Sequence, residues 1–208
     1  MISIYQLKPK FQALLKPMLK ILHRLGVTAN QITFGSVLLS LLIGVSFWYS
    51  EDVQILYLVL PLGLLLRMAL NALDGMMARI YKQQSKKGEL LNEFGDVVSD
   101  LFIYFPLVKY EHEIIYLIIV FICLSLLNEF TGLLGKVVSN ERRYEGPMGK
   151  SDRAFIISIY GILAFASINI SDFSFYIFSI LNLLLILSTF TRLRKTQAKI
   201  KTETTLKK

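Results

Sequence analysis

The sequence predicts an all-α membrane protein in which six transmembrane helices follow an N-terminal amphipathic helix at the membrane interface. Of its 208 residues, 54% are hydrophobic and only 18% are charged, whereas soluble domains carry about a quarter charged residues. The mean hydropathy is +0.54. This composition excludes intrinsic disorder, and the single cysteine, Cys123, excludes a disulfide scaffold. The net charge of +8 is divided among short clusters between apolar runs, which indicates membrane topology and not a nucleic-acid partner.

Residues 1–30 are predicted to form a cytoplasmic amphipathic segment. Leu, Phe and Met residues recur at helical spacing among the basic residues from Lys8 to Arg24, and the segment contains no acidic residue. A helix of this kind lies in the membrane interface. A positively charged lead into the first span would explain the same residues, and the two interpretations are compatible.

Residues 31–192 are predicted to form a single membrane domain, and residues 193–208 a basic cytoplasmic tail. A transmembrane helix needs about 20 mostly apolar residues. The predicted spans are residues 32–49, 53–73, 90–108, 114–138, 154–170 and 173–190.

The basic residues predict the orientation of these spans. Twenty-one of the 23 Lys and Arg residues fall in four stretches of one predicted side: residues 1–30, 79–87, 136–153 and 192–208. The loops on the opposite side contain one basic residue, Lys109. By the positive-inside rule, both termini and both basic loops are cytoplasmic. We therefore expect an integral protein of the inner membrane of a prokaryote.

Polar residues gather where the second span ends and the third begins. Asn71 and Asp74 lie about 60° apart on one helix, and Asn92, Asp96 and Asp100 drift by only about 40° per step on the next. Ionisable residues in spans usually face a bundle interior or a watery cavity, and hard oxygen donors suit Mg²⁺ or Mn²⁺. The structural alternative is helix packing, with Asp74 paired to Arg67 or Arg79.

The same residues form an extended motif. Asn71-Ala-Leu-Asp74-Gly75-Met-Met-Ala78-Arg79, then eight residues and Gly88-x3-Asn92-x3-Asp96, resembles the signature D-x2-D-G-x2-A-R-x8–9-G-x3-D-x3-D of the CDP-alcohol phosphatidyltransferases. The stretch before the first span, 26–33, is similar to the family's Thr-Pro-Asn-x-x-Thr, with Ala29 in place of proline.

This resemblance implies an enzyme of phospholipid biosynthesis that transfers a phosphatidyl group from CDP-diacylglycerol to an alcohol and releases CMP. It also implies a homodimer. Metal ligands would be Asp74, Asp96, Asn71, Asn92 and Asp100. The CDP-binding residues would be Asp74, Gly75, Ala78, Arg79, Gly88 and Thr33. Asp96 would be the general base.

Two departures from the motif concern charge. Asn71 and Asn92 stand where the family has its first and third aspartates, so each position loses one negative charge. Four carboxylates suit two divalent ions, whereas two carboxylates leave a charge of +2 uncompensated. Asp100 and Glu93 could restore the balance; the alternatives are a single-metal site or an inactive homologue.

The second basic loop is the predicted acceptor site. Lys150, Arg153 and Arg143 lie around the start of the fifth span, where a helix N-terminus favours anions, so a phosphorylated acceptor such as glycerol 3-phosphate is expected. Topology alone explains these bases equally well.

Two other function classes remain open from the sequence: a catalytically silent homologue that binds CDP-lipid, and a small transporter. A transporter should have polar residues through the full membrane depth, but here they stop near the cytoplasmic third. An exception is Glu129 in the fourth span, predicted to pair with Arg67 or line the cavity.

Overall fold

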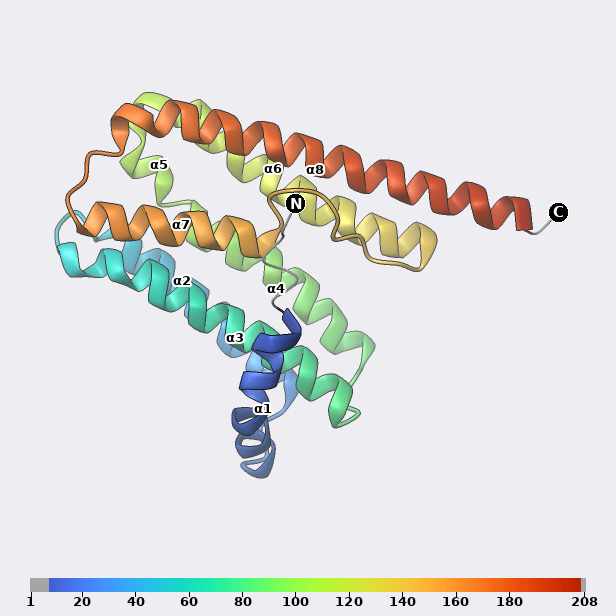
Figure 1. Ribbon diagram of the computed structural model, residues 1–208. Coiled ribbons are helices and arrows are strands. Elements are labelled where there is room, and N and C mark those ends of the chain that lie inside the picture. The colour runs from blue at the N-terminus through green and yellow to red at the C-terminus, as the bar shows by residue number, and fades with distance from the viewer. Residues whose placement is uncertain (1–7, 207–208) are drawn as a thin grey trace. The chain divides into compact units, whose positions relative to one another are not determined.

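The computed structural model describes residues 8–206, and within them every regular element is helical (Figure 1). This confirms the all-α prediction. The elements in chain order are α1 (Lys8–Arg24), α2 (Ala29–Trp48), η2 (Gln54–Leu58), α3 (Val59–Ile80), α4 (Lys86–Tyr104), α5 (Leu107–Tyr110), η3 (His112–Ile114), α6 (Ile115–Ser139), α7 (Lys150–Phe165) and α8 (Ser171–Leu206).

The chain divides into two compact units. The first contains the residues up to Pro106 together with Ala154–Asn169, and the second contains Leu107–Arg153 and Ile170–Lys208. The helix α7 begins in the second unit and continues in the first. The sequence did not indicate this division, and the predicted boundaries at residues 30 and 192 stay predictions.

In the first unit, α2 packs against both α3 and α4. Side chains fix the starts of two of these helices. The Thr28 hydroxyl accepts a hydrogen bond from the Gln31 backbone N–H, and the Gln31 side chain accepts one from the Thr28 N–H, so α2 begins with a capping box. The hydroxyl of Ser85 caps α4 by accepting from the Gly88 N–H at 3.0 Å.

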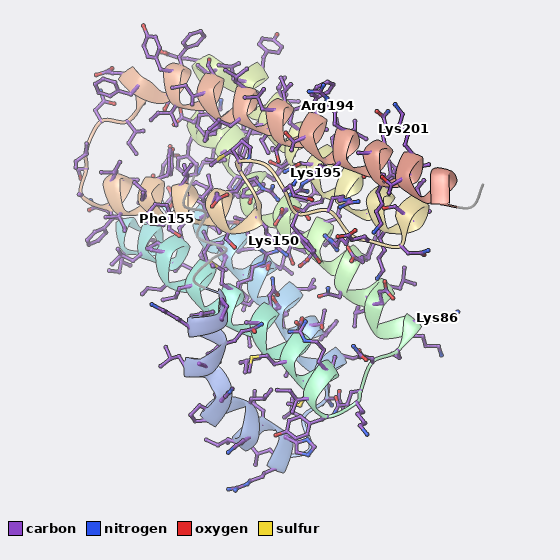
Figure 2. All side chains as sticks on the ribbon, turned by 45° about the vertical axis from the view of Figure 1, so that its right-hand side comes forward. Lys86, Lys150, Phe155, Arg194, Lys195 and Lys201 are labelled. Carbon is purple, nitrogen blue, oxygen red and sulfur yellow. The ribbon has the colours of Figure 1, made fainter. Side chains whose placement is uncertain are left out.

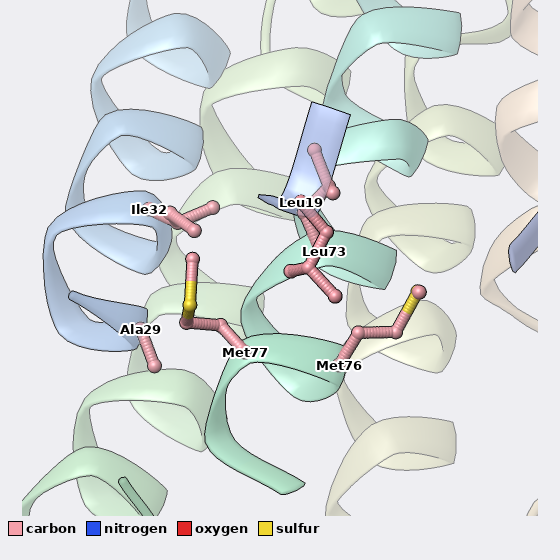
Figure 3. Packing of buried hydrophobic residues seen from close by; sticks show 6 residues of the cluster. All are labelled: Leu19, Ala29, Ile32, Leu73, Met76 and Met77. Carbon is pink, nitrogen blue, oxygen red and sulfur yellow. The ribbon is translucent and has the colours of Figure 1, made fainter. Parts of the chain in front are cut away.

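One face of the helix α1 packs on the C-terminal part of α3. Leu19, only 2% exposed, packs with Leu73, Met76 and Met77 of α3 and with residues of α2 (Figure 3). A second row of apolar side chains on α1 is exposed: Leu14, Met18, Ile21 and Leu25. The segment Lys8–Arg24 is helical, and its role as an amphipathic helix in the membrane interface stays a prediction.

In the second unit, α6 and α8 lie side by side (Figure 1). The rings of Phe121 and Phe178 meet edge to face at 5.5 Å, and the Asn182 side chain donates to the Leu117 carbonyl oxygen at 3.0 Å. The connection over residues 140–149 is irregular, and Asn140 ends α6 in the left-handed conformation with φ 52°.

Four stretches are long and apolar enough to cross a membrane: Ala29–Trp48, Gln54–Ile80, His112–Ser139 and Ser171–Thr202. They correspond to four of the six predicted spans. The other two spans become α4, which carries four acidic residues, and α7, which has only 16 residues. The count of six membrane crossings is therefore not confirmed.

The predicted basic tail continues a helix and does not follow one. The last span was expected to end at residue 190, but α8 runs from Ser171 to Leu206. Residues 190–206 contain no Gly or Pro and include several good helix formers. Charged residues at the end of an apolar helix limit the part that is embedded in the membrane, but they do not end the helix.

Candidate active site

Two hydroxyls of α2 hold the polar motif residues of α3. The Thr33 hydroxyl lies 2.9 Å from Asp74 Oδ2, and the Ser36 hydroxyl donates to Asn71 Oδ1 at 2.7 Å. The Thr33 oxygen also lies 3.1 Å from the Ala29 carbonyl oxygen, and a charged carboxylate is the stronger acceptor for its one hydrogen. Thr33 was predicted from the resemblance, whereas Ser36, one helical turn further on, was missed.

A buried ion pair joins the inner ends of the two motif helices. Arg67 Nη2 on α3 lies 3.1 Å from Asp100 Oδ1 on α4, and the two side chains are 2% and 0% exposed. Arg67 therefore pairs with Asp100, and the suggested partners Asp74 and Glu129 were wrong. The register between α3 and α4 determines which residues pair, and the sequence of either helix alone does not reveal that register.

The pair also sets the level of the remaining motif residues. The chain reverses direction between α3 and α4. Asn71 on α3 and Asp96 on α4 each lie four residues from the pair, about 6 Å along the helix axis, toward the connection between the two helices. The following turn reaches Asp74 on α3 and Asn92 on α4. Asn71, Asn92 and Asp96 are half-buried, and Asp74 is buried.

Asp100 differs from the other predicted ligands in its contacts, and the predicted ligand set stays a prediction. Among the described residues, no group of three or more His, Cys, Asp or Glu side chains is placed to hold a metal ion. Asp100 therefore does not join Asp74 and Asp96 in one cluster, because its carboxylate is held by Arg67. The oxygen donors that remain are two carboxylates and two amides, a chemically suitable set for a hard divalent cation.

Gly75 follows Asp74, and its position has room for a Cβ atom. A Cβ atom at this position would meet only the Arg79 guanidinium, at 3.7–3.9 Å, which is ordinary contact. Arg79 itself is exposed. The glycine is therefore not required by packing within the described part of the chain, as expected if a ligand approaches the helix there.

Gly88 and Ala78 have packing explanations. A Cβ atom on Gly88 would lie 2.6 Å from Asn30 Oδ1, so this glycine lets the start of α4 approach α2. Ala78 packs against the apolar cluster of α1, α2 and α3. The connection between the motif helices is fixed nearby: Gln83 Oε1 accepts from the Ala29 N–H at 2.8 Å, and His23 stacks on Tyr81. Their predicted CDP contacts stay predictions.

We expect Gly75→Ala to leave the fold intact and to weaken the use of CDP-diacylglycerol. An alanine suits a helix interior better than glycine, but an added methyl in a tight pocket costs about tenfold or more in kcat/KM. The control is Gly35→Ala, since a Cβ atom at Gly35 meets nothing within 4 Å. If the kinetics of Gly75→Ala, measured by CDP-diacylglycerol titration, are unchanged, the nucleotide does not bind at this position.

The predicted acceptor residues lie in a buried ionic cluster of the second unit. Glu129 on α6, 6% exposed, contacts Arg153 Nη2 through Oε1 at 2.9 Å and Arg142 Nη2 through Oε2 at 3.0 Å. Lys150 and Arg192 also interact electrostatically with this carboxylate. Four basic side chains thus surround this one buried carboxylate.

The arginines of this cluster also fasten the 140–149 connection. Arg153 donates to the Met148 carbonyl oxygen at 3.1 Å, and Arg192 donates to the carbonyl oxygens of Glu145, at 3.2 Å, and Asn128. Arg143, 7% exposed, pairs with Glu141 and Glu145 at 3.4 and 3.5 Å. Its buried Nε has no hydrogen-bond partner. The sequence missed Arg192, which looked like one more base of the tail.

Glu145 shows how this basic surrounding acts on a carboxylate outside the spans. Partial burial raises the pKa of Glu145, but hydrogen bonds from the backbone and the charge of Lys195 outweigh burial and lower it. Lys195 Nζ lies 3.4 Å from Glu145 Oε1, and basic side chains continue along α8 with Arg194 and Lys201 (Figure 2). Glu145 therefore stays ionised at neutral pH.

Comparison with known proteins agrees with this arrangement. The family model described as CDP-alcohol phosphatidyltransferase matches residues 26–198. The chain is 45% identical over 160 residues to inner membrane protein YnbA of Escherichia coli K12, covering 77% of the chain and 79% of that protein. It is 33% identical over 100 residues to archaetidylinositol phosphate synthase of Pyrococcus horikoshii, covering 48% and 50%.

Solved structures share the fold. The phosphatidylinositol phosphate synthase PgsA1 of Mycobacterium tuberculosis, solved with manganese and citrate, superposes with a TM-score of 0.70. The sequences are 15% identical, over 87% of this chain and 88% of that one. The same enzyme with CDP-DAG bound gives a TM-score of 0.65 at 16% identity, over 86% and 92%.

Proposed function

The chain belongs to the CDP-alcohol phosphatidyltransferase family, a family of enzymes, and we propose that it transfers a phosphatidyl group from CDP-diacylglycerol to an alcohol. The observation that carries the proposal is the pairing of α2 hydroxyls with Asp74 and Asn71, which orients the motif residues of α3 toward one site. The CDP-DAG and the manganese in the PgsA1 structures support the same chemistry.

In the proposed reaction, the acceptor hydroxyl oxygen attacks the phosphorus that bears the diacylglycerol. The bond from that phosphorus to the bridging oxygen breaks, and CMP leaves with the bridging oxygen. The proton of the hydroxyl passes to Asp96, the last carboxylate of the motif, which is half-buried on α4. A carboxylate is a weak base, so the close placement of the hydroxyl must contribute much of the activation.

Divalent metal would be held by Asp74 and Asp96, with Asn71 and Asn92 as amide oxygen donors. A bound Mg²⁺ or Mn²⁺ would neutralise the charge that develops on the diphosphate as CMP departs. Thr33 and Ser36 orient the two donors on α3, and such outer hydrogen bonds fix the direction in which a ligand presents its lone pairs. The space beside Gly75 would admit the cytidine nucleotide, with exposed Arg79 at its phosphate.

The acceptor would bind at the basic residues around Glu129, and their positive charge favours an acceptor that carries a phosphate. Lys150, Arg153 and Arg143 are the proposed contacts, and the buried Arg143 Nε has an unused donor. Glycerol 3-phosphate is one such acceptor, and the inositol phosphate named for the two synthases above is of the same chemical class. The protein would act at the inner membrane with both termini in the cytoplasm, as a homodimer.

We expect Lys150→Gln to raise the KM for a phosphorylated acceptor about ten- to a hundredfold, because one charge-assisted contact is worth about 1.5–3 kcal/mol. The KM for CDP-diacylglycerol should change little. Lys150 is half-buried at the start of α7, so it suits this test better than Arg153, whose loss disturbs Glu129 as well. Lys201→Gln, on the exposed end of α8, is the control. If the KM is unchanged for every acceptor, the basic loop does not bind the acceptor, and its charges serve only to set the membrane topology.

The function itself is tested by CMP release from the purified protein with radiolabelled CDP-diacylglycerol, a panel of alcohols, and Mn²⁺ or chelator. We expect metal-dependent CMP and a labelled lipid product with one class of alcohol. A silent homologue would bind CDP-diacylglycerol without releasing CMP, and a transporter would do neither. Either result would refute the proposal.

A further inference from the structure

The number of metal ions in this site follows from which carboxylates can reach it. The motif helices carry five acidic residues: Asp74 on α3, and Glu89, Glu93, Asp96 and Asp100 on α4. Within residues 8–206, they do not come together as a three-acid cluster. The positions that would supply further carboxylates are Asn71 and Asn92, which offer neutral oxygens only.

Asp100 is committed to a different partner. It is 0% exposed, and Arg67, 2% exposed, holds it at 3.1 Å. A buried carboxylate that left a buried arginine would strand an uncompensated charge, which is strongly unfavourable. The pair is therefore neutral as a unit and contributes no net charge to the site one turn away.

The remaining charge is −2, from Asp74 and Asp96, and this balances one divalent cation. A second divalent cation would bring an uncompensated +2 into a site that is mostly buried, where isolated charge is costly.

We propose that the site binds a single divalent cation per chain, held by Asp74 and Asp96, while Arg67 keeps Asp100 out of the ligand set. The proposal rests on the proposed function only in assuming that a divalent cation binds this site at all. It makes Arg67 a positioning residue, which acts on the site by fixing Asp100.

The test is the Mn²⁺ stoichiometry of the full-length protein purified in detergent, stripped with chelator and then titrated with Mn²⁺ in the absence of substrate. Bound Mn²⁺ is measured by equilibrium dialysis with elemental analysis, and the spacing of the ions by electron paramagnetic resonance. We expect one Mn²⁺ per chain with the spectrum of an isolated ion. The double variant Asn71→Asp/Asn92→Asp should bind two, with a spectrum broadened by coupling between neighbouring ions.

The paired variant Arg67→Met/Asp100→Leu is the matched control, because it removes both charges of the buried pair together and should keep one Mn²⁺. Wild-type protein that binds two ions or none, or loss of Mn²⁺ from a folded Arg67→Met/Asp100→Leu, would overturn the proposal. The proposal of a single ion can fail or hold independently of the proposed function. One bound ion without CMP release refutes only the activity, and CMP release with two bound ions refutes only the stoichiometry.

Discussion

Asp96→Asn is expected to abolish CMP release while the protein stays folded. Asp96 is half-buried on α4, and the substitution preserves shape while removing the basic oxygen. General base catalysis typically contributes about 10²- to 10⁴-fold, so the residual kcat should fall by at least about a hundredfold. Turnover is measured with CDP-diacylglycerol and saturating acceptor, and folding by gel filtration and circular dichroism.

The matched control is Asp52→Asn, which makes the same chemical change at an exposed position between α2 and α3. Two roles of Asp96 are separated by measuring Mn²⁺ binding in the same variant. A base that is not a ligand would leave Mn²⁺ bound, whereas a ligand would lose it together with turnover. Activity like that of the wild type would exclude Asp96 from both roles.

The helices of the site were predictable because the apolar runs and the motif spacing are local properties of the sequence. Asn71 and Asp74 share a face of α3 by periodicity alone, and Thr33 was found through the resemblance. The pairing of Arg67 with Asp100 was not predictable, because the spacing on each helix fixes a face but not the register between two helices. If α3 were shifted by one helical turn along α4, Arg67 would meet a different acidic residue.

The second unit was harder to predict for a different reason. Positive-inside topology already explains every base in the 140–149 connection and in α8, so the sequence does not single out Arg192 or Arg143. Glu129 was recognised as unusual, but its partners come from segments 13 and 24 residues further along the chain. Long-range packing decides such partners, and α8 continues past the expected end of its span because nothing in its residues stops a helix.

The largest effect on stability is expected from Glu129→Gln. The glutamine keeps the size and one oxygen acceptor of Glu129 but removes the carboxylate charge that contacts both Arg153 and Arg142. Arg153 is 1% exposed, so its charge would remain in a buried position without this partner. Breaking a buried ion pair in this way typically costs about 3–5 kcal/mol, measured as the free energy of unfolding in reversible detergent denaturation.

Glu141→Gln separates this effect from the loss of any negative charge near the arginines. Glu141 is 53% exposed and contacts Arg143 and Lys199 at 3.4 and 3.5 Å, and exposed ion pairs contribute about 0–1 kcal/mol. The connection over residues 140–149 should also become sensitive to protease in Glu129→Gln, because Arg153 and Arg192 fasten its carbonyl oxygens. If both variants unfold at the same denaturant concentration as the wild type, Glu129 does not hold the cluster together.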